Sequence, residues 1–251
     1  MECYILNRID TIFIGPVPAA YLIGGSMGTK KMSIREAMAT SETIRMFSNP
    51  LLERLSHVHP ATPFVIYIPV IGSLVYLAIT STPLSATDII GSFCIGVLFW
   101  TFIEYFLHRF IFHIPQTNRV FKAIYFYSHG IHHDAPRDAT RLVMPPGASI
   151  PLAVALFFLF RYFLPLHYLP FMGGFLTGYV IYDFLHFSVH FFQFKNAYFK
   201  MIRRNHMMHH YRAPLKNFGF TSPVWDYVGG SYFGSTAADR NVDDHSGLKP
   251  L

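Results

Sequence analysis

The chain has 251 residues, of which 52% are hydrophobic, 17% aromatic and only 14% charged, and its formal net charge is +6. An ordinary soluble domain carries about 25% charged residues, so this composition argues against a soluble, disordered or solenoid protein and indicates long apolar segments. The only two cysteines, Cys3 and Cys94, are far apart, which excludes a disulfide framework and a CxxC metal site. The unusual feature is the presence of fourteen histidines in so apolar a chain.

Four apolar stretches predict the fold class. They cover residues 64–80, 89–107, 148–166 and 168–187, and each approaches the ~20 residues that a helix needs to cross a bilayer core. Within each pair the break is short and holds no Lys or Arg. We therefore expect an all-α integral membrane protein with four transmembrane helices arranged as two hairpins.

The basic residues predict how these helices are oriented. Apart from Arg161, all of them lie before the first stretch, in the 108–141 linker, or from Lys195 onward. Positive loops usually face the cytoplasm, so both termini and the linker are expected on the cytosolic side of a multi-pass protein, and both short turns on the lumenal side. The positive charge also suits an anionic lipid surface. No RNA- or DNA-binding motif accompanies it, which argues against nucleic acid as a partner.

Composition along the chain predicts three regions. Residues 1–60 are expected to form an N-terminal leader and an amphipathic cytosolic segment. Apolar side chains recur at helical spacing over residues 33–56, interrupted at Pro50, as in helices that lie on a membrane surface. Residues 61–235 are expected to form the membrane domain, and residues 236–251 a polar C-terminal tail.

Ten of the fourteen histidines fall into four clusters. Positions i, i+3 and i+4 share one face of a helix, so HxxHH and HxxxH can each point two or three imidazoles at a common centre. The first pair is five residues apart, about 140° off one face, so we expect the helix to end between its members; the nearby Pro115 favours such an ending. The clusters are His108 and His113; His129, His132 and His133; His186 and His190; His206, His209 and His210.

The four clusters are predicted to meet at one cytoplasmic face, because two follow the exit of the second apolar stretch and two follow the exit of the fourth. Ten imidazoles are more than one ion can use and enough for two. Neutral imidazole suits iron, zinc or copper, and no cluster contains cysteine. The sequence therefore predicts a cytosolic helical cap with a histidine-rich dimetal site. The remaining histidines are expected at the membrane interface (His57 and His59), in a lumenal turn (His167) and in the polar tail (His245).

Two carboxylates lie close to the clustered histidines in sequence. Glu104 is four residues before His108, and Asp183 is three residues before His186, so each shares a helix face with a candidate ligand. A carboxylate that accepts the second imidazole N–H would fix its tautomer, and carboxylates within a membrane are usually functional. The alternative is that they pair with Arg109 or a neighbouring tyrosine.

Aromatic residues on the fourth stretch are the candidates for substrate contact. Tyr179 and Tyr182 flank the approach to the third histidine cluster, where they could line a substrate entrance or simply pack against other helices. Arg161, in the middle of the third stretch, is expected to snorkel or to pair with a carboxylate and is given no catalytic role.

Several motifs resemble those of the fatty acid 2-hydroxylases, which belong to the fatty acid hydroxylase and sterol desaturase superfamily of integral membrane oxygenases. The resemblance covers about residues 60–235. Its most particular features are the HxxxxH spacing of the first cluster, RLVMPP, and the GYVIYD that leads into the third cluster. The matching segments are TFIEYFLHRFIFH (101–113), YSHGIHH (127–133), RLVMPP (141–146), GYVIYDFLHFSVH (178–190), NHMMHH (205–210) and NFGFTSPVWD (217–226).

This resemblance implies a dimetal centre with all ten clustered histidines as ligands. It implies iron for catalysis, with zinc as an ion the site can also hold. The implied reaction is O2-dependent hydroxylation at C2 of a long fatty acyl or ceramide chain that feeds 2-hydroxy sphingolipids, at the endoplasmic reticulum membrane. Residues 1–60 lack the HPGG haem motif of a cytochrome b5 domain, since His59-Pro60 is followed by Ala-Thr. Electrons are therefore expected from a separate cytochrome b5 and its reductase.

Two alternative functions stay open at this stage. One is a sterol or sphingoid-base hydroxylase or desaturase of the same superfamily. The other is a histidine-rich membrane metal transporter or sensor, which would need ligands along a pathway at mid-bilayer rather than together at one face.

Overall fold

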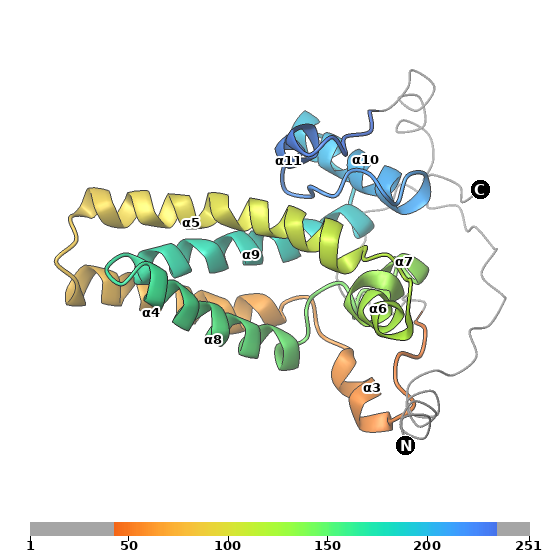
Figure 1. Cartoon of the computed structure of the whole chain (residues 1–251), viewed down its shortest axis with the longest axis horizontal. Helices are drawn as coiled ribbons and strands as arrows, with labels where there is room; N and C mark the ends of the chain where they lie inside the picture. Colours follow the sequence, from red (N-terminus) through yellow and green to blue (C-terminus); the bar gives the residue numbers. More distant parts are fainter. Residues whose placement is uncertain (1–42, 235–251) are drawn as a thin grey trace.

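The computed structural model describes residues 43–234, and in this range every regular element is a helix (Figure 1). Four long helices form the body of the molecule: α4 (Thr62–Ser81), α5 (Ala86–Phe106), α8 (Pro146–Phe163) and α9 (Tyr168–Phe191). The α4–α5 and α8–α9 connections lie at one end of this bundle, so the long helices form two hairpins. The predicted all-α class is confirmed.

The turn between α4 and α5 shows how local sequence sets the first hairpin. Pro83 follows the end of α4 closely, where a helix cannot continue. Ser85 then caps α5: its hydroxyl accepts the Asp88 N–H at 3.2 Å, and the Asp88 carboxylate accepts the Ser85 N–H at 3.1 Å. This reciprocal capping box starts the second helix only a few residues after the first one ends.

Within residues 43–234, three helices are long and apolar enough to cross a membrane: Thr62–Ser81, Ala86–Phe112 and Pro146–Phe163. They match three of the four apolar stretches, and the chain is a multi-pass membrane protein by its helix composition. The fourth predicted stretch forms α9, which has 24 residues but is less apolar than the other three. Since α9 packs against α4, α5 and α8 and is mostly buried, protein rather than lipid covers much of its surface.

The contact between α5 and α9 is exceptionally close. A Cβ atom on Gly174 would lie 1.9 Å from the Phe93 carbonyl oxygen, and one on Gly96 would lie 2.1 Å from the Phe171 carbonyl oxygen. Glycine at both crossing points lets the two backbones touch, as small residues do in membrane helix pairs. The rings of Trp100, Phe171 and Phe175 pack around this crossing and form part of the bundle core.

The shorter helices gather at the other end of the bundle and form a cap (Figure 1). Their bounds are α3 (Pro50–Ser56), α6 (Arg119–Tyr125), α7 (Ile131–Asp134), α10 (Ala197–Tyr211) and α11 (Val224–Val228), together with the π-helices η1 (Leu107–Phe112) and η2 (Phe126–Gly130). Asn118 and Asn196 cap α6 and α10 by accepting backbone N–H groups at the first turns. Pro50 begins α3, at the predicted break in the apolar pattern of residues 33–56. Residues 1–42 and 235–251, which include the predicted leader and polar tail, lie outside the described residues.

The helix ends at Phe112, between His108 and His113 as predicted, but it ends in a π-turn rather than in a break after His108. The chain stays helical from α5 through η1, where the His113 N–H donates to the His108 carbonyl oxygen at 3.1 Å, five residues back. A π-turn of this kind takes more residues per turn than an α-helix and is frequent at functional sites. It brings the two histidines of the HxxxxH motif to one side without a break in the chain.

An ion-pair cluster ties α3 to the segment that precedes α8. The Arg141 side chain is almost fully buried and reaches Glu53 at 2.6 Å and Asp138 at 3.3 Å. It also donates to the Ser56 hydroxyl at 2.8 Å. Burial by itself raises the pKa of Glu53, but N–H groups of residues 46 and 47 together with Arg141 bring that pKa below its ordinary value, so the pair is charged at neutral pH.

Substituting Arg141 with Met is expected to destabilise the protein by about 3–5 kcal/mol, because the buried Asp138 and the half-buried Glu53 would be left without their cation. The measurement is thermal or denaturant unfolding in detergent. Arg54, an exposed cation on the same helix as Glu53, offers the control: Arg54→Met should change stability by no more than about 0.5 kcal/mol. Equal effects of the two changes would contradict a role for the buried pairs.

Candidate metal centre

The ten clustered histidines come together in the cap as two adjacent groups of five. Within each group, one nitrogen from every residue lies within 4.8 Å of the corresponding nitrogens of the others. The first histidine group contains His108, His113, His129, His133 and His209, and the second histidine group contains His132, His186, His190, His206 and His210. The structure thus assembles all ten residues that the sequence singled out, from η1, η2, α7, α9 and α10.

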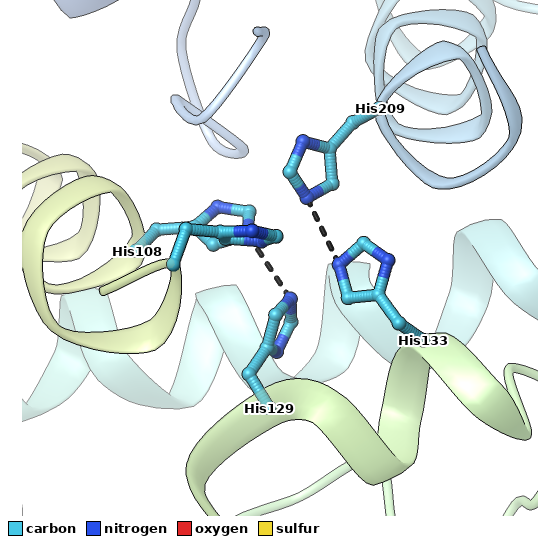
Figure 2. Close-up of side chains that lie close together, drawn as sticks. His108, His129, His133 and His209 are labelled. Atoms are coloured by element: carbon cyan, nitrogen blue, oxygen red, sulfur yellow. Dashed lines mark hydrogen bonds between the residues drawn. The ribbon is translucent and has the colours of Figure 1, made fainter. Parts of the chain in front are cut away.

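Each HxxHH motif contributes to both groups. The outer two histidines of a motif are four residues apart and face nearly the same way, while the middle one is turned by about 60° from the first and about 100° from the last. His129 and His133 therefore join the first group, where they face His108 and His209 in Figure 2. The α10 motif is divided in the opposite sense, with His206 and His210 in the second group and His209 in the first.

The nitrogen atoms are arranged to bind cations. In the second group, the His206 Nε2 atom lies 3.1, 2.9 and 3.0 Å from the Nε2 atoms of His186, His190 and His210. A neutral imidazole nitrogen makes one hydrogen bond, so it cannot satisfy three such neighbours. Adjacent imidazole ligands bound at ~2.1 Å to one ion lie roughly 3 Å apart, which fits these separations.

The first group also brings imidazole nitrogens close together. The Nε2 atoms of His108 and His129 are 3.1 Å apart, and so are those of His133 and His209, as the dashed lines of Figure 2 mark. The Nε2 atom of His113 is buried and has no hydrogen-bond partner among the described residues. The all-imidazole donor set suits iron or zinc in either group.

The imidazoles are neutral, as metal ligands must be. Burial lowers the pKa of His113 to about 4, and burial together with neighbouring imidazoles lowers the pKa of His133 to about 2. The same two causes hold the pKa well below its usual value for the five other cap histidines that lie outside the long helices: His129, His132, His206, His209 and His210. Their lone pairs are free for a cation at neutral pH.

Backbone carbonyls orient three of the rings. The Nδ1 atom of His108 lies 2.7 Å from the Phe218 carbonyl oxygen, and that of His209 lies 2.8 Å from the Lys216 carbonyl oxygen. In the second group, the His186 Nδ1 atom is 3.3 Å from the Leu142 carbonyl oxygen. A carbonyl only accepts, so each Nδ1 carries the proton and each Nε2 lone pair points into its group.

The predicted contact between Glu104 and the second nitrogen of His108 is wrong, because the Phe218 carbonyl occupies that place. The buried Glu104 carboxylate instead accepts the N–H groups of Phe220 and Thr221 at 2.6 and 2.8 Å and the Thr221 hydroxyl at 2.6 Å. These partners are more than 100 residues away in sequence, which no local spacing could reveal. Glu104 thus acts on the loop beside the histidines rather than on an imidazole.

Asp183 likewise does not contact the Nδ1 atom of His186, which faces Leu142. Its carboxylate lies near the Tyr179 hydroxyl, and both are buried, with Asp183 Oδ2 and Tyr179 Oη lacking hydrogen-bond partners among the described residues. The Tyr67 hydroxyl, on the facing helix α4, is buried and unpartnered in the same way. Tyr182 stacks its ring on the His186 ring at 5.5 Å between centroids.

The other histidines lie away from the two groups. His57 contacts Thr140 and Arg141, and His59 is exposed before α4. His167 bonds Ser92 at the opposite end of the bundle, as expected for the turn between α8 and α9. His245 is outside the described residues.

The sequence analysis missed the backbone carbonyls of residues 142, 216 and 218, which bond the histidine rings. Every residue has a backbone carbonyl, so no residue type in the sequence marks these contacts.

The chain resembles known hydroxylases over this whole region. Residues 93–231 match the fatty acid hydroxylase family. The chain is 41% identical to the dihydroceramide fatty acyl 2-hydroxylase FAH2 of Arabidopsis thaliana over 58% of its own length and 62% of the relative's. With FAH1 of the same plant it shares 34% identity over 79% of its length and 84% of the relative's.

A yeast relative and a solved structure extend the comparison. The ceramide very long chain fatty acid hydroxylase SCS7 of Saccharomyces cerevisiae is 43% identical over 58% of this chain and 38% of its own length. The structure of full-length scs7p, in which only the hydroxylase domain is visible, superposes with a TM-score of 0.71 at 32% identity and covers 80% of this chain and 78% of that one. The chain spans about six tenths of FAH2 and less of SCS7. It belongs to the fatty acid hydroxylase family.

Proposed function

We propose that this chain hydroxylates a long fatty acyl group at C2, in an O2-dependent reaction that feeds 2-hydroxy ceramides and other sphingolipids. The observation that carries the proposal is the convergence of ten neutral imidazoles into two adjacent groups of donors at one end of an apolar helix bundle. Relatives named as fatty acyl or ceramide 2-hydroxylases support the choice of reaction and substrate. Ligands gathered at one end, rather than along the bundle, disfavour a metal transporter.

Side chains alone cannot oxidise an unactivated C–H bond, so two bound metal ions, iron for catalysis, would supply the O2-activating redox chemistry. All ten clustered histidines are the proposed ligands. Insertion of one oxygen atom into the C2–H bond reduces the other to water and consumes two electrons and two protons. We propose a separate cytochrome b5 and its reductase as the source of the electrons, with the protons taken from solvent.

The chain's own residues hold and shield this reaction. The carbonyls of Leu142, Lys216 and Phe218 fix the Nδ1 protons of three of the proposed ligands, so that the Nε2 lone pairs of these rings are already directed toward the ions they would hold. The rings of Phe218 and Phe220 pack against the histidines of the first and second groups and exclude water from that side. A dry wall of this kind limits loss of a reactive oxidant to solvent.

The depth of the metal centre supports oxidation near the carboxyl end of the chain. His108 lies at the end of the apolar helix Ala86–Phe112, so the centre sits at the level of lipid headgroups when that helix spans the bilayer. The first carbons of an acyl chain lie at this depth. We propose that Tyr182 and the unpartnered buried polar atoms of Tyr67, Tyr179 and Asp183 line the entry for the polar end of the substrate.

We propose four membrane spans, with α9 as the fourth, and a cytosolic cap, which places the metal centre and both termini in the cytosol and the two short turns in the lumen. Basic residues in the cap and their absence from both turns support this orientation. A lipid substrate of sphingolipid synthesis favours the endoplasmic reticulum. We further propose residues 1–60 as a leader and amphipathic segment, 61–235 as the hydroxylase membrane domain and 236–251 as a polar tail; the exposed Leu51 and Leu55 of α3 suit a lipid surface.

Expression in cells that lack endogenous 2-hydroxylase activity tests the function. We expect 2-hydroxy acyl chains to accumulate in ceramides and related sphingolipids, measured by mass spectrometry of total lipids with and without the chain. Microsomes supplied with 18O2 should place one labelled oxygen in the product, since the hydroxyl derives from O2.

The same lipid profiles separate the alternatives. New oxidised sterols or sphingoid bases without 2-hydroxy acyl chains would contradict the proposed reaction and support another reaction of the wider superfamily. Metal flux into proteoliposomes without any lipid product would support metal transport as the function instead.

A further inference from the structure

The loop of residues 216–221 joins α10 to α11 and lies beside the first histidine group. Its Phe218 carbonyl accepts from His108 and its Lys216 carbonyl accepts from His209, at 2.7 and 2.8 Å between nitrogen and oxygen. One short segment therefore orients two of the five rings of that group. It has no helix or strand hydrogen bonds of its own, so its shape must be set by other contacts.

Asp226, on α11, provides those contacts. Its buried carboxylate accepts the Phe218 N–H at 2.8 Å and the Gly219 N–H at 2.7 Å. In a trans peptide the N–H of one residue and the C=O of the preceding residue point in opposite directions. Holding the Gly219 N–H toward Asp226 thus directs the Phe218 carbonyl away from Asp226 and toward His108.

Asp226 also influences the direction of the Lys216 carbonyl, through Ser231. The Ser231 N–H donates to the Asp226 backbone oxygen at 2.8 Å, and the Ser231 hydroxyl donates to its carboxylate at 2.7 Å. The Ser231 carbonyl in turn accepts the Asn217 N–H at 3.0 Å, which fixes the peptide whose oxygen, that of Lys216, faces His209. Asn217 adopts a φ of 54°, which asparagine tolerates better than most residues.

Glycine is required at the centre of this loop. A Cβ on Gly219 would lie 2.4 Å from the Ser222 carbonyl oxygen and 2.9 Å from Asp226 Oδ2. Glu104 holds the far end of the loop through Phe220 and Thr221 and so ties it to α5, one turn before His108. Among the described hydrogen bonds, none joins the loop to the second group, which it meets through the ring of Phe220.

We infer that Asp226, with Glu104 in support, is a positioning residue that sets the direction of two loop carbonyls and thereby controls metal binding by the first histidine group. The inference rests on the proposed metal centre but not on the reaction that the centre performs. Asp226 touches no imidazole. Its effect passes through the Phe218 and Lys216 carbonyls, which hold His108 and His209 with their Nε2 lone pairs toward the metal.

The test is metal content per chain, measured by plasma mass spectrometry on full-length protein purified in detergent. Wild type should hold two ions, and Asp226→Asn should hold one. An asparagine has a single acceptor oxygen, so its NH2 group must face either the Gly219 N–H or the Phe218 N–H and break that contact. Glu104→Ala should also lose metal from the first group, whereas Glu104→Gln should retain both ions, because one amide oxygen can accept both N–H groups.

Double variants identify the affected group. Added to His209→Ala, which empties the first group, Asp226→Asn should remove no further metal; added to His206→Ala, it should remove the remaining ion. Val228→Ala, at an exposed position of the same helix α11, is the matched control and should keep two ions. If Asp226→Asn does not purify as folded protein, Gly219→Ala gives the second measurement, with the same expected loss.

Three results would overturn the inference: two ions bound by Asp226→Asn, further loss of metal in the His209→Ala background, or equal loss in Val228→Ala. If the variants show the expected metal contents but the wild-type chain forms no 2-hydroxy lipid, the proposed function is contradicted and the inference on Asp226 is not.

Discussion

Replacing His206 with alanine is expected to abolish formation of 2-hydroxy lipid, with a loss of at least about a hundredfold, since even indirect partners of a metal ligand cost about 10–100-fold. The His206 Nε2 atom is the point at which the nitrogens of His186, His190 and His210 converge, each within 3.1 Å. Its removal takes a donor from the centre of the second group. The measurements are product by lipid mass spectrometry and metal content of the purified protein.

Alanine at His129 or His209 should have the same effect through the first group, because the reaction needs both ions. His59→Ala is the matched control: this histidine is exposed, lies outside both groups and should leave product and metal content unchanged. Membrane insertion should be normal in all four variants. Activity retained by any of the three ligand variants would mean that the histidine groups are not the active centre.

The second large effect is expected from Gly174→Ala on α9. The added Cβ would lie 1.9 Å from the Phe93 carbonyl oxygen and 3.0 Å from its Cα, so it meets backbone rather than a side chain that can rotate away. Overpacking in ordinary cores costs about 1–3 kcal/mol. Here the whole of α9 must move away from α5, so we expect a loss of stability at or above the upper end of that range.

Thermal unfolding in detergent, followed by size-exclusion chromatography, measures this loss. Gly72, in the middle of α4, offers a matched control, because a Cβ there meets nothing within 4 Å. Gly72→Ala should leave stability unchanged or raise it by about 0.5–1 kcal/mol, as alanine favours helix over glycine. Equal behaviour of the two variants would contradict the close contact of α5 with α9.

Hydropathy predicted the long helices well because a helix in an apolar medium needs apolar side chains along its whole length, and these side chains are visible in the sequence. The stretch 64–80 became Thr62–Ser81, and 89–107 became Ala86–Phe106. The fourth stretch extends four residues beyond its predicted end, to Phe191, because hydropathy falls at the imidazoles while the helix continues through them. Its central position, covered by other helices, also explains why it is less apolar than the rest.

The ten histidines could be found from spacing alone, but their division into two groups could not. It depends on how the helices α7 and α10 face each other across the cap. Contacts that orient the rings were equally hidden, because they come from carbonyls of distant segments. Spacing suggested Glu104 as the partner of His108, yet both residues bond to the loop of residues 216–221: His108 to the Phe218 carbonyl and Glu104 to the Phe220 N–H.

The π-turn of η1 makes two different sequence motifs equivalent in space. His186 and His190, four residues apart on the regular α-helix α9, contribute two imidazoles to the second group, while His108 and His113, five apart, contribute two imidazoles to the first. One wider turn of the helix thus accommodates the additional residue between the two histidines. A homologous chain that has lost one residue there, and reads HxxxH in place of HxxxxH, would keep the same pair of imidazoles together by reverting to α-helical hydrogen bonding. The number of residues between the two histidines can therefore change in evolution while the site that they build is preserved.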